Sequence, residues 1–178
     1  MDTPDFSSTS PTDIGRILAM SLDRSCKIDL ISEQERSLLA DAKVPIEHYH
    51  RERLVLAGFA LDYAIVMLLT NSNIRNQARD GYLGTWLNMS KQSAAGMALY
   101  QLFIQRCPEY ADAVARMKPG SINPIATAFY GFLLSDKGPN GSAAMLADMC
   151  APSMYFTHFE VAAETLHLAG LISKPRDN

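Results

Sequence analysis

A long apolar run with one acidic residue at its centre constrains the fold more than any other feature of this sequence. Residues 54–70 read LVLAGFALDYAIVMLLT, and 14 of these 17 residues are apolar. A helix needs about 20 apolar residues to cross a bilayer, and a central charge such as Asp62 adds roughly 2.5 to 3.5 kcal/mol to the cost of insertion. We therefore expect a buried helix of a soluble protein, without membrane contact.

The composition favours one globular domain and argues against nucleic-acid binding. The chain has 178 residues, 48% of them hydrophobic and 20% charged, so it can bury most of its unfolded surface in a single core. Its net charge is -3, and its longest basic cluster is Arg51 and Arg53 with Glu52 between them. A nucleic-acid binder needs a stripe of Lys and Arg to neutralise phosphates, and no segment of the sequence provides one.

Cysteine usage and the first residues predict a cytoplasmic protein. Cys26, Cys107 and Cys150 are widely spaced, odd in number and without a C-x-x-C pair, which is typical of reduced core thiols. The beginning of the sequence, MDTPDFSSTSPT, has neither the basic nor the apolar region of a signal peptide.

The whole chain has the periodicity of helices. Apolar residues recur at spacings of three and four, and we find no strand-length alternation, internal repeat or sustained heptad. The sequence predicts an all-α protein, a single compact bundle of about seven to nine helices in one domain over residues 10–172. Residues 1–9 are expected to be a disordered tail and residues 173–178 a flexible one.

Capping patterns mark the starts of several helices. An N-cap side chain accepts a hydrogen bond from a backbone N–H of the first turn, proline suits the first helical position, and a glutamate three residues after the cap completes a capping box. The sequence shows three such patterns: Ser10 with Pro11, Ser32 with Glu35, and Asn123 with Pro124.

Prolines and a glycine predict further boundaries. Pro45, Pro108 and Pro152 are each expected to open a helix, because proline inside a helix removes a backbone hydrogen bond. Gly170 is expected to follow the last helix as its left-handed capping residue. The sequence leaves open whether residues 91–106 continue the helix before them or begin a new one.

A polar turn at residues 71–73 predicts a central antiparallel hairpin, with residues 45–70 as its first arm and residues 73–90 as its second. Gly81 and Gly84 lie in the second arm. Their expected purpose is to let the second arm approach the first closely.

The hairpin suggests partners for Asp62, because an unpaired buried carboxylate costs several kcal/mol or becomes protonated. Asp62 lies about 13 Å along the axis from the turn, a height that Tyr82 shares on the returning arm. We hypothesise that Arg79, Tyr82 or Trp86 donates hydrogen bonds to Asp62 and so fixes the register of the hairpin. The alternative is that Asp62 lines a cavity.

That alternative defines a candidate ligand site. Aromatic residues and methionines in the later helices are expected to pack in the core, and an apolar pocket between helices is the alternative, because methionine adapts to irregular ligands. A small apolar molecule is the expected ligand. The candidate ligand-binding residues are Asp62, Arg79, Tyr82, Trp86, Tyr130 and His158.

A metal site is a weaker alternative. Glu47-x-x-His50 and Glu164-x-x-His167 have the spacing that di-iron carboxylate proteins use. However, Glu47 lies in a first turn, where the helix dipole explains an acidic residue. Glu160, Glu164 and His167 lie away from the apolar stripe of their helix. We therefore expect no metal and no cofactor.

The sequence favours a non-catalytic function. It contains no G-x-S-x-G nucleophile elbow and no glycine-rich phosphate loop. The leading hypothesis is a cytoplasmic helical interaction or regulatory protein that self-associates as a homodimer. A small-molecule-binding protein or enzyme with a pocket around Asp62 is the alternative, and a metal-carboxylate enzyme is a more remote one.

Overall fold

The protein is all-α, as the sequence predicts. The computed structural model describes residues 8–118, 123–134 and 138–173, and every regular element within these ranges is a helix. Seven α-helices and one short 3₁₀ helix lie there, which confirms the expected number. In chain order they are α1 (Pro11–Ser25), η1 (Ile28–Leu30), α2 (Glu33–Ala42), α3 (Ile46–Leu68), α4 (Ser72–Ser90), α5 (Ala94–Ala115), α6 (Pro124–Leu134) and α7 (Gly141–Leu168).

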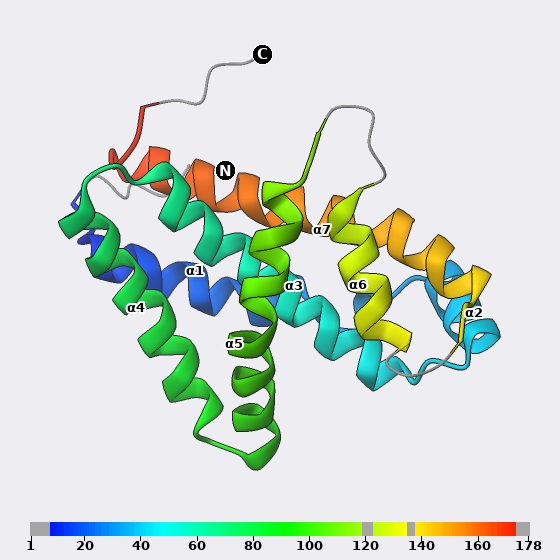
Figure 1. The fold of residues 1–178 in the computed structure, drawn as a ribbon. Coiled ribbons are helices and arrows are strands. Elements are labelled where there is room, and N and C mark those ends of the chain that lie inside the picture. The colour runs from blue at the N-terminus through cyan, green and yellow to red at the C-terminus, as the bar shows by residue number, and fades with distance from the viewer. Residues whose placement is uncertain (1–7, 119–122, 135–137, 174–178) are drawn as a thin grey trace.

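Helix α3 forms the centre of the molecule (Figure 1). Helices α1, α4, α5, α6 and α7 all pack against it, and every residue of α3 from Val55 to Asp62 is buried. Buried residues of all seven helices form one apolar core. None of the described helices is long and apolar enough to cross a membrane. Most of the two expected tails, residues 1–9 and 173–178, lies outside the described residues.

The capping patterns form as expected. The side chain of Ser10 accepts a hydrogen bond from the N–H three residues later. Ser32 and Glu35 make both hydrogen bonds of a capping box, and Asn123 accepts an N–H of the first turn of α6 at 3.0 Å. Gly170 has the expected positive φ, 68°.

Two expected boundaries are wrong, because α5 and α7 continue through Pro108 and Pro152. Proline removes one helical hydrogen bond at each position, but both helices pack against α3 and α6. That packing outweighs the local loss. The chain breaks instead at residues 91–93, where Ser93 accepts the N–H of Gly96 at 3.0 Å and caps the start of α5.

The second arm of the hairpin packs mainly on α1 rather than on α3. A Cβ atom on Gly81 would collide with the carbonyl of Thr12, and one on Gly15 would collide with the carbonyl of Ala78. The expectation that the glycines serve contact with α3 is therefore wrong: Gly81 faces α1, and a Cβ on Gly84 would meet nothing within 4 Å. Figure 1 shows α4 diverging from α3 beyond the turn.

Candidate functional site

Asp62 is paired with Arg79, as one of the sequence hypotheses expects. The Nε and Nη2 atoms of Arg79 donate to the two carboxylate oxygens of Asp62 at 2.8 and 2.9 Å. Asp62 is 5% exposed, whereas the Arg79 side chain is 46% exposed. The hydrogen bond to Asp62 raises the pKa of Arg79. This bidentate contact ties α4 to α3 and fixes their register, while a ligand-binding role for Asp62 stays a prediction.

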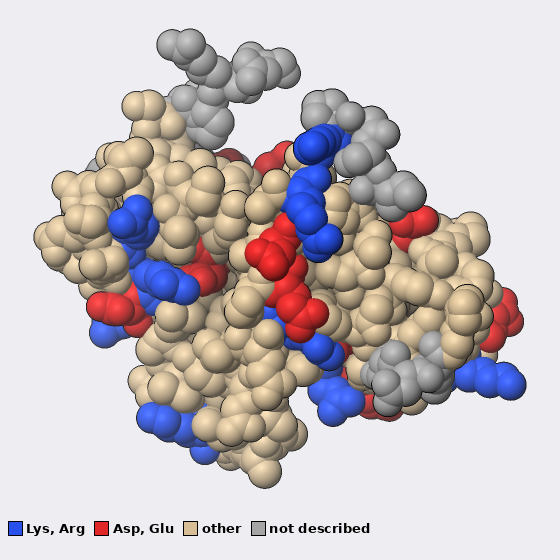
Figure 2. Space-filling view, viewed as in Figure 1, with Lys and Arg blue, Asp and Glu red and all other residues tan. Residues whose placement is uncertain are grey.

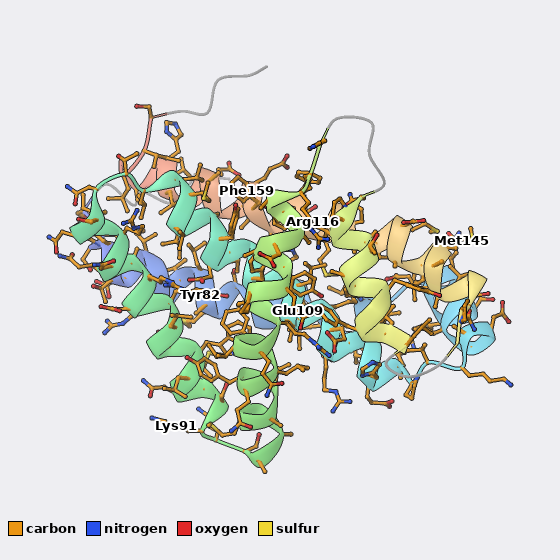
Figure 3. The ribbon with its side chains drawn as sticks, viewed as in Figure 1. Tyr82, Lys91, Glu109, Arg116, Met145 and Phe159 are labelled. Atoms are coloured by element: carbon orange, nitrogen blue, oxygen red, sulfur yellow. The ribbon has the colours of Figure 1, made fainter. Side chains whose placement is uncertain are left out.

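The aromatic candidates beside Asp62 have other partners. The hydroxyl of Tyr82, labelled in Figure 3, donates to the carbonyl oxygen of Gly58 at 2.9 Å and not to Asp62. The ring of Trp86 packs on that of Phe103 with 4.2 Å between centroids, and Trp86 also lines an apolar cavity of about 170 Å³. These contacts belong to the core.

The remaining ligand candidates are Tyr130, which lies on α6 against the start of α7, and His158, which lies within α7. The hydroxyl of Tyr130 accepts the backbone N–H of Asn140 at 3.0 Å, at the start of that helix. His158 is buried, with Nδ1 2.8 Å from the carbonyl oxygen of Met154 and Nε2 3.7 Å from the sulfur of Cys26. Because a carbonyl only accepts, Nδ1 carries the proton of the neutral ring. Burial lowers the pKa of His158, which keeps the ring neutral.

The structure gives the metal candidates no shared site. Glu160 and Glu164 are exposed, and Nδ1 of His167 lies 3.4 Å from the carbonyl oxygen of Ile172. Nε2 of His50 lies 2.6 Å from a backbone carbonyl oxygen at the end of α1. Among the described residues, no three His, Cys, Asp or Glu side chains are grouped so that they could hold a metal.

Glu35 is the centre of a polar cluster that the sequence reasoning treated only as a helix cap. One carboxylate oxygen accepts the N–H and hydroxyl of Ser32, both at 2.7 Å. The other accepts the hydroxyl of Tyr49 at 2.6 Å, with the thiol of Cys150 at 3.7 Å. Burial alone would raise the pKa of Glu35, but the hydrogen bonds from Tyr49 and Ser32 outweigh it and lower the pKa. The acceptor capacity of Glu35 is therefore filled.

Arg53 lies beside this cluster, and two of its three side-chain nitrogens have no hydrogen-bond partner. Its side chain is 10% exposed, and Nη1 approaches the nearest oxygen of Glu35 only to 3.9 Å. Nε and Nη1 are buried without a hydrogen-bond partner. The guanidinium lies 5.6 Å from the ring centroid of Tyr49. Buried polar groups are nearly always hydrogen-bonded in folded proteins, so Arg53 is an exception that requires an explanation.

Arg53 lines a cavity of about 340 Å³ between α2, α3 and α7. Met149 and Met154 supply apolar wall, and the volume is at the lower end of the range of small-molecule sites. We call this cavity the Arg53 pocket. Its polar lining includes Glu35, Arg53, Cys150, Ser153, Thr157 and His158.

His158 is the one sequence candidate in the Arg53 pocket, and the reasoning from sequence missed Arg53 and Glu35. A signal was present, because positions 49, 53, 56 and 60 fall on one face of a helix at 100° per residue. That face is buried in α3.

Comparisons of the chain with known protein families, curated proteins and solved structures find no match.

Proposed function

We propose that this protein is a non-catalytic binding protein whose ligand is a small organic anion held by Arg53. The observation that carries the proposal is an arginine side chain that is nine-tenths buried, lines a cavity and has no hydrogen bond on Nε or Nη1. A carboxylate complements one edge of a guanidinium through two parallel charge-assisted hydrogen bonds, which here come from Nη2 together with either Nε or Nη1. The proposal keeps the small-molecule alternative from the sequence and transfers its site from Asp62 to Arg53.

The filled hydrogen-bond acceptors of Glu35 favour an anionic ligand over a cationic one. A cationic ligand would need a carboxylate with free acceptor capacity, but Ser32 and Tyr49 already fill both oxygens of Glu35. The groups of the pocket that lack a hydrogen-bond partner are donors, Nε and Nη1 of Arg53. Exposed hydroxyl groups of Ser153 and Thr157 lie in the same lining and add donors for the oxygen atoms of a ligand.

The ionisable groups of the pocket support binding rather than catalysis. Burial raises the pKa of the Cys150 thiol, which disfavours the nucleophilic thiolate. Both ring nitrogens of His158 lie against other groups of the protein, so the ring has no nitrogen left for a substrate proton. A regulatory protein that senses a metabolite needs a pocket of this kind and no reactive group.

The test uses benzoate as the probe, because it combines a carboxylate with an apolar ring for the methionine wall. Titration of the ¹⁵N-labelled protein should shift the amide signals of Ser32, Cys150 and Thr157 in a saturable way. Arg53→Met should weaken binding by about tenfold or more, because a hydrogen bond to a charged group contributes about 1.5 to 3 kcal/mol.

Arg51→Met is the matched control, since Arg51 is exposed on the same helix and does not line the Arg53 pocket. It should bind benzoate like the parent protein. Ser153→Phe, at an exposed position of the lining, should block the pocket without touching the guanidinium. Equal benzoate binding by the Arg53→Met and parent proteins would contradict the proposal.

A second candidate function, self-association as a homodimer, is favoured by an exposed apolar stripe on α7. Met145, Met149 and Phe156 are 51%, 40% and 44% exposed and lie within about 40° of each other around the helix axis. Met145 is labelled in Figure 3 on this helix. Methionine and aromatic residues are enriched at subunit interfaces.

Light scattering on the purified protein tests the dimer. A dimer has twice the chain mass of 19.6 kDa, and Phe156→Asp should return the mass to that of one chain. Val161→Asp is the control, because Val161 is 40% exposed but lies about 140° from Phe156 around the helix. A parent protein of single-chain mass would contradict self-association.

We also propose that this binding protein is cytoplasmic. No disulfide joins Cys26, Cys107 and Cys150, and burial raises the pKa of Cys107 to about 12. Unreactive thiols without disulfides suit a reducing compartment. Fluorescent tagging in the native cell tests this location, and a signal at the cell surface would contradict it.

A further inference from the structure

Glu52, the residue before Arg53, is a buried carboxylate without hydrogen bonds. It is 0% exposed, and neither of its oxygens has a hydrogen-bond partner. The nearest cation is Arg106 on α5, with 3.6 Å between Nη2 and Oε1. Burial raises the pKa of Glu52, against the opposing effects of Arg106, His48 and Arg51.

Two neighbours of Glu52 on α5 also have polar atoms without a hydrogen-bond partner. Nε of Arg106 and the hydroxyl of Tyr110 are buried without a hydrogen bond. The Arg106 guanidinium lies 3.7 Å from the ring centroid of Phe132, and its Nη1 is 3.8 Å from Glu109, a residue labelled on α5 in Figure 3. Three buried groups with unmet hydrogen bonds at one place are unusual for a folded protein.

Glu52 and Arg106 line a cavity of about 310 Å³ between α3 and α5, which we call the Glu52 pocket, whereas Tyr110 lies one turn beyond Arg106 on α5 and outside the lining. Figure 2 shows charged side chains of both signs over the upper part of α5, whereas the surface over its lower part is mostly uncharged. The lining of the pocket combines apolar and amide side chains with the ion pair. It includes Glu52, Ala98, Leu99, Gln101, Leu102 and Arg106.

We propose that the Glu52 pocket is a second ligand site, which binds a neutral molecule bearing a carboxamide. The amide N–H donates to Glu52, and the amide carbonyl accepts from Arg106. The Arg106 side chain is 24% exposed and Glu52 is not, so Arg106 is the member of the pair that is displaced when the ligand enters.

The charges of the lining select a neutral ligand. A cation would be repelled by Arg51 and Arg106, and a plain carboxylate would be repelled by ionised Glu52. An amide places a donor next to an acceptor, which complements a carboxylate beside a guanidinium. It equally complements a protonated carboxyl group, which offers one donor and one acceptor. The hydrogen-bond complementarity to an amide therefore holds for either protonation state of Glu52, whereas the exclusion of a carboxylate ligand requires the ionised one.

This site is independent of the Arg53 pocket, and the two respond to different probes. Benzamide is the probe here, with N,N-dimethylbenzamide as the matched compound that lacks the N–H donor. In the ¹⁵N-labelled protein, benzamide at millimolar concentration should shift the amide signals of α3 around Glu52 and of α5 around Arg106. N,N-dimethylbenzamide should bind at least about tenfold more weakly, because without an N–H donor on the ligand Glu52 stays unpaired.

Glu52→Met should weaken benzamide binding by at least about tenfold, as the loss of the N–H donor does. It should leave benzoate binding at the Arg53 pocket unchanged. Glu47→Met, at an exposed position of the same helix, should bind benzamide like the parent protein. If Glu52→Met does not fold, Ala98→Trp decides, because Ala98 is exposed and the indole ring would fill the pocket. Equal binding of benzamide and N,N-dimethylbenzamide, or no shift in α3 and α5, would overturn the proposal.

Discussion

Helix α3 carries two buried carboxylates, Asp62 and Glu52, whose hydrogen bonding differs sharply. Arg79 donates two hydrogen bonds to Asp62 at 2.8 and 2.9 Å, whereas Arg106 approaches Glu52 only to 3.6 Å and neither Glu52 oxygen accepts a hydrogen bond. Their side chains are 8% and 1% exposed. Burial of a charge therefore does not by itself distinguish a structural residue from a candidate site. The distinction lies in whether the partner fills the hydrogen-bonding capacity.

The largest expected effect comes from removing the partner of Asp62. Arg79→Met should lower the free energy of unfolding by about 2 to 3 kcal/mol, because a buried carboxylate is left without its donors. The loss should be smaller than for a fully buried pair, since the Arg79 side chain is 46% exposed and water can reach the site. Urea denaturation measures the change. Arg75→Met, one turn earlier on α4, is the control, and an equal loss there would show that Asp62 does not depend on Arg79.

A smaller effect is expected at Glu52. Glu52→Met should leave the free energy of unfolding within about 1 kcal/mol of the parent value or raise it, because an apolar residue of similar size replaces a buried carboxylate without hydrogen bonds, and water can solvate the Arg106 side chain, which is 24% exposed. The same denaturation experiment measures it. A loss as large as that of Arg79→Met would remove the contrast between the two carboxylates and mark the Glu52 pair as structural.

The smallest effect is a difference in pH dependence between Glu52 and Glu35. The pKa of Glu52 is raised from 4.5 by burial, so the folded state holds the proton more tightly and the contribution of Glu52 to stability falls as the pH rises above 4.5. Burial alone would raise the pKa of Glu35, but its hydrogen bonds lower it from 4.5, so its contribution is lost as the pH falls below 4.5.

Denaturation of the parent protein, Glu52→Met and Glu35→Gln on both sides of pH 4.5 tests these signs. The stability of the parent protein relative to Glu52→Met should fall with rising pH, and its stability relative to Glu35→Gln should fall with falling pH. Parallel curves for all three proteins would show that neither carboxyl group has a shifted pKa.

Much of the fold was predictable because it depends on local interactions. The caps at Ser10, Ser32 and Asn123 satisfy backbone groups within one turn, and the Asp62 to Arg79 pair joins residues across one short turn. The prolines show the limit of local reasoning. Pro108 and Pro152 have the same local cost as any helix proline, but the packing of α5 and α7 on the rest of the molecule decides that the helices continue.

The candidate sites were less accessible from the sequence. Glu35 could be recognised as part of a capping box, but its contacts with Tyr49 and Cys150 join residues from three helices. Arg53 and Glu52 were visible only as a charged cluster before the apolar run. The helical face shared by positions 49, 53, 56 and 60 was the available indication that Arg53 is buried.

The sequence by itself determined an all-α chain, the starts of most of its helices, and a buried Asp62 that needs a partner from the next helix. Only the tertiary structure decided that α4 packs on α1, that α2, α3 and α7 line the Arg53 pocket, and that both Glu52 oxygens and Nε and Nη1 of Arg53 lack hydrogen bonds. The physical reason is that a cap or a periodic apolar face depends on residues a few positions apart. An unmet hydrogen bond, in contrast, depends on every group that the whole fold brings near.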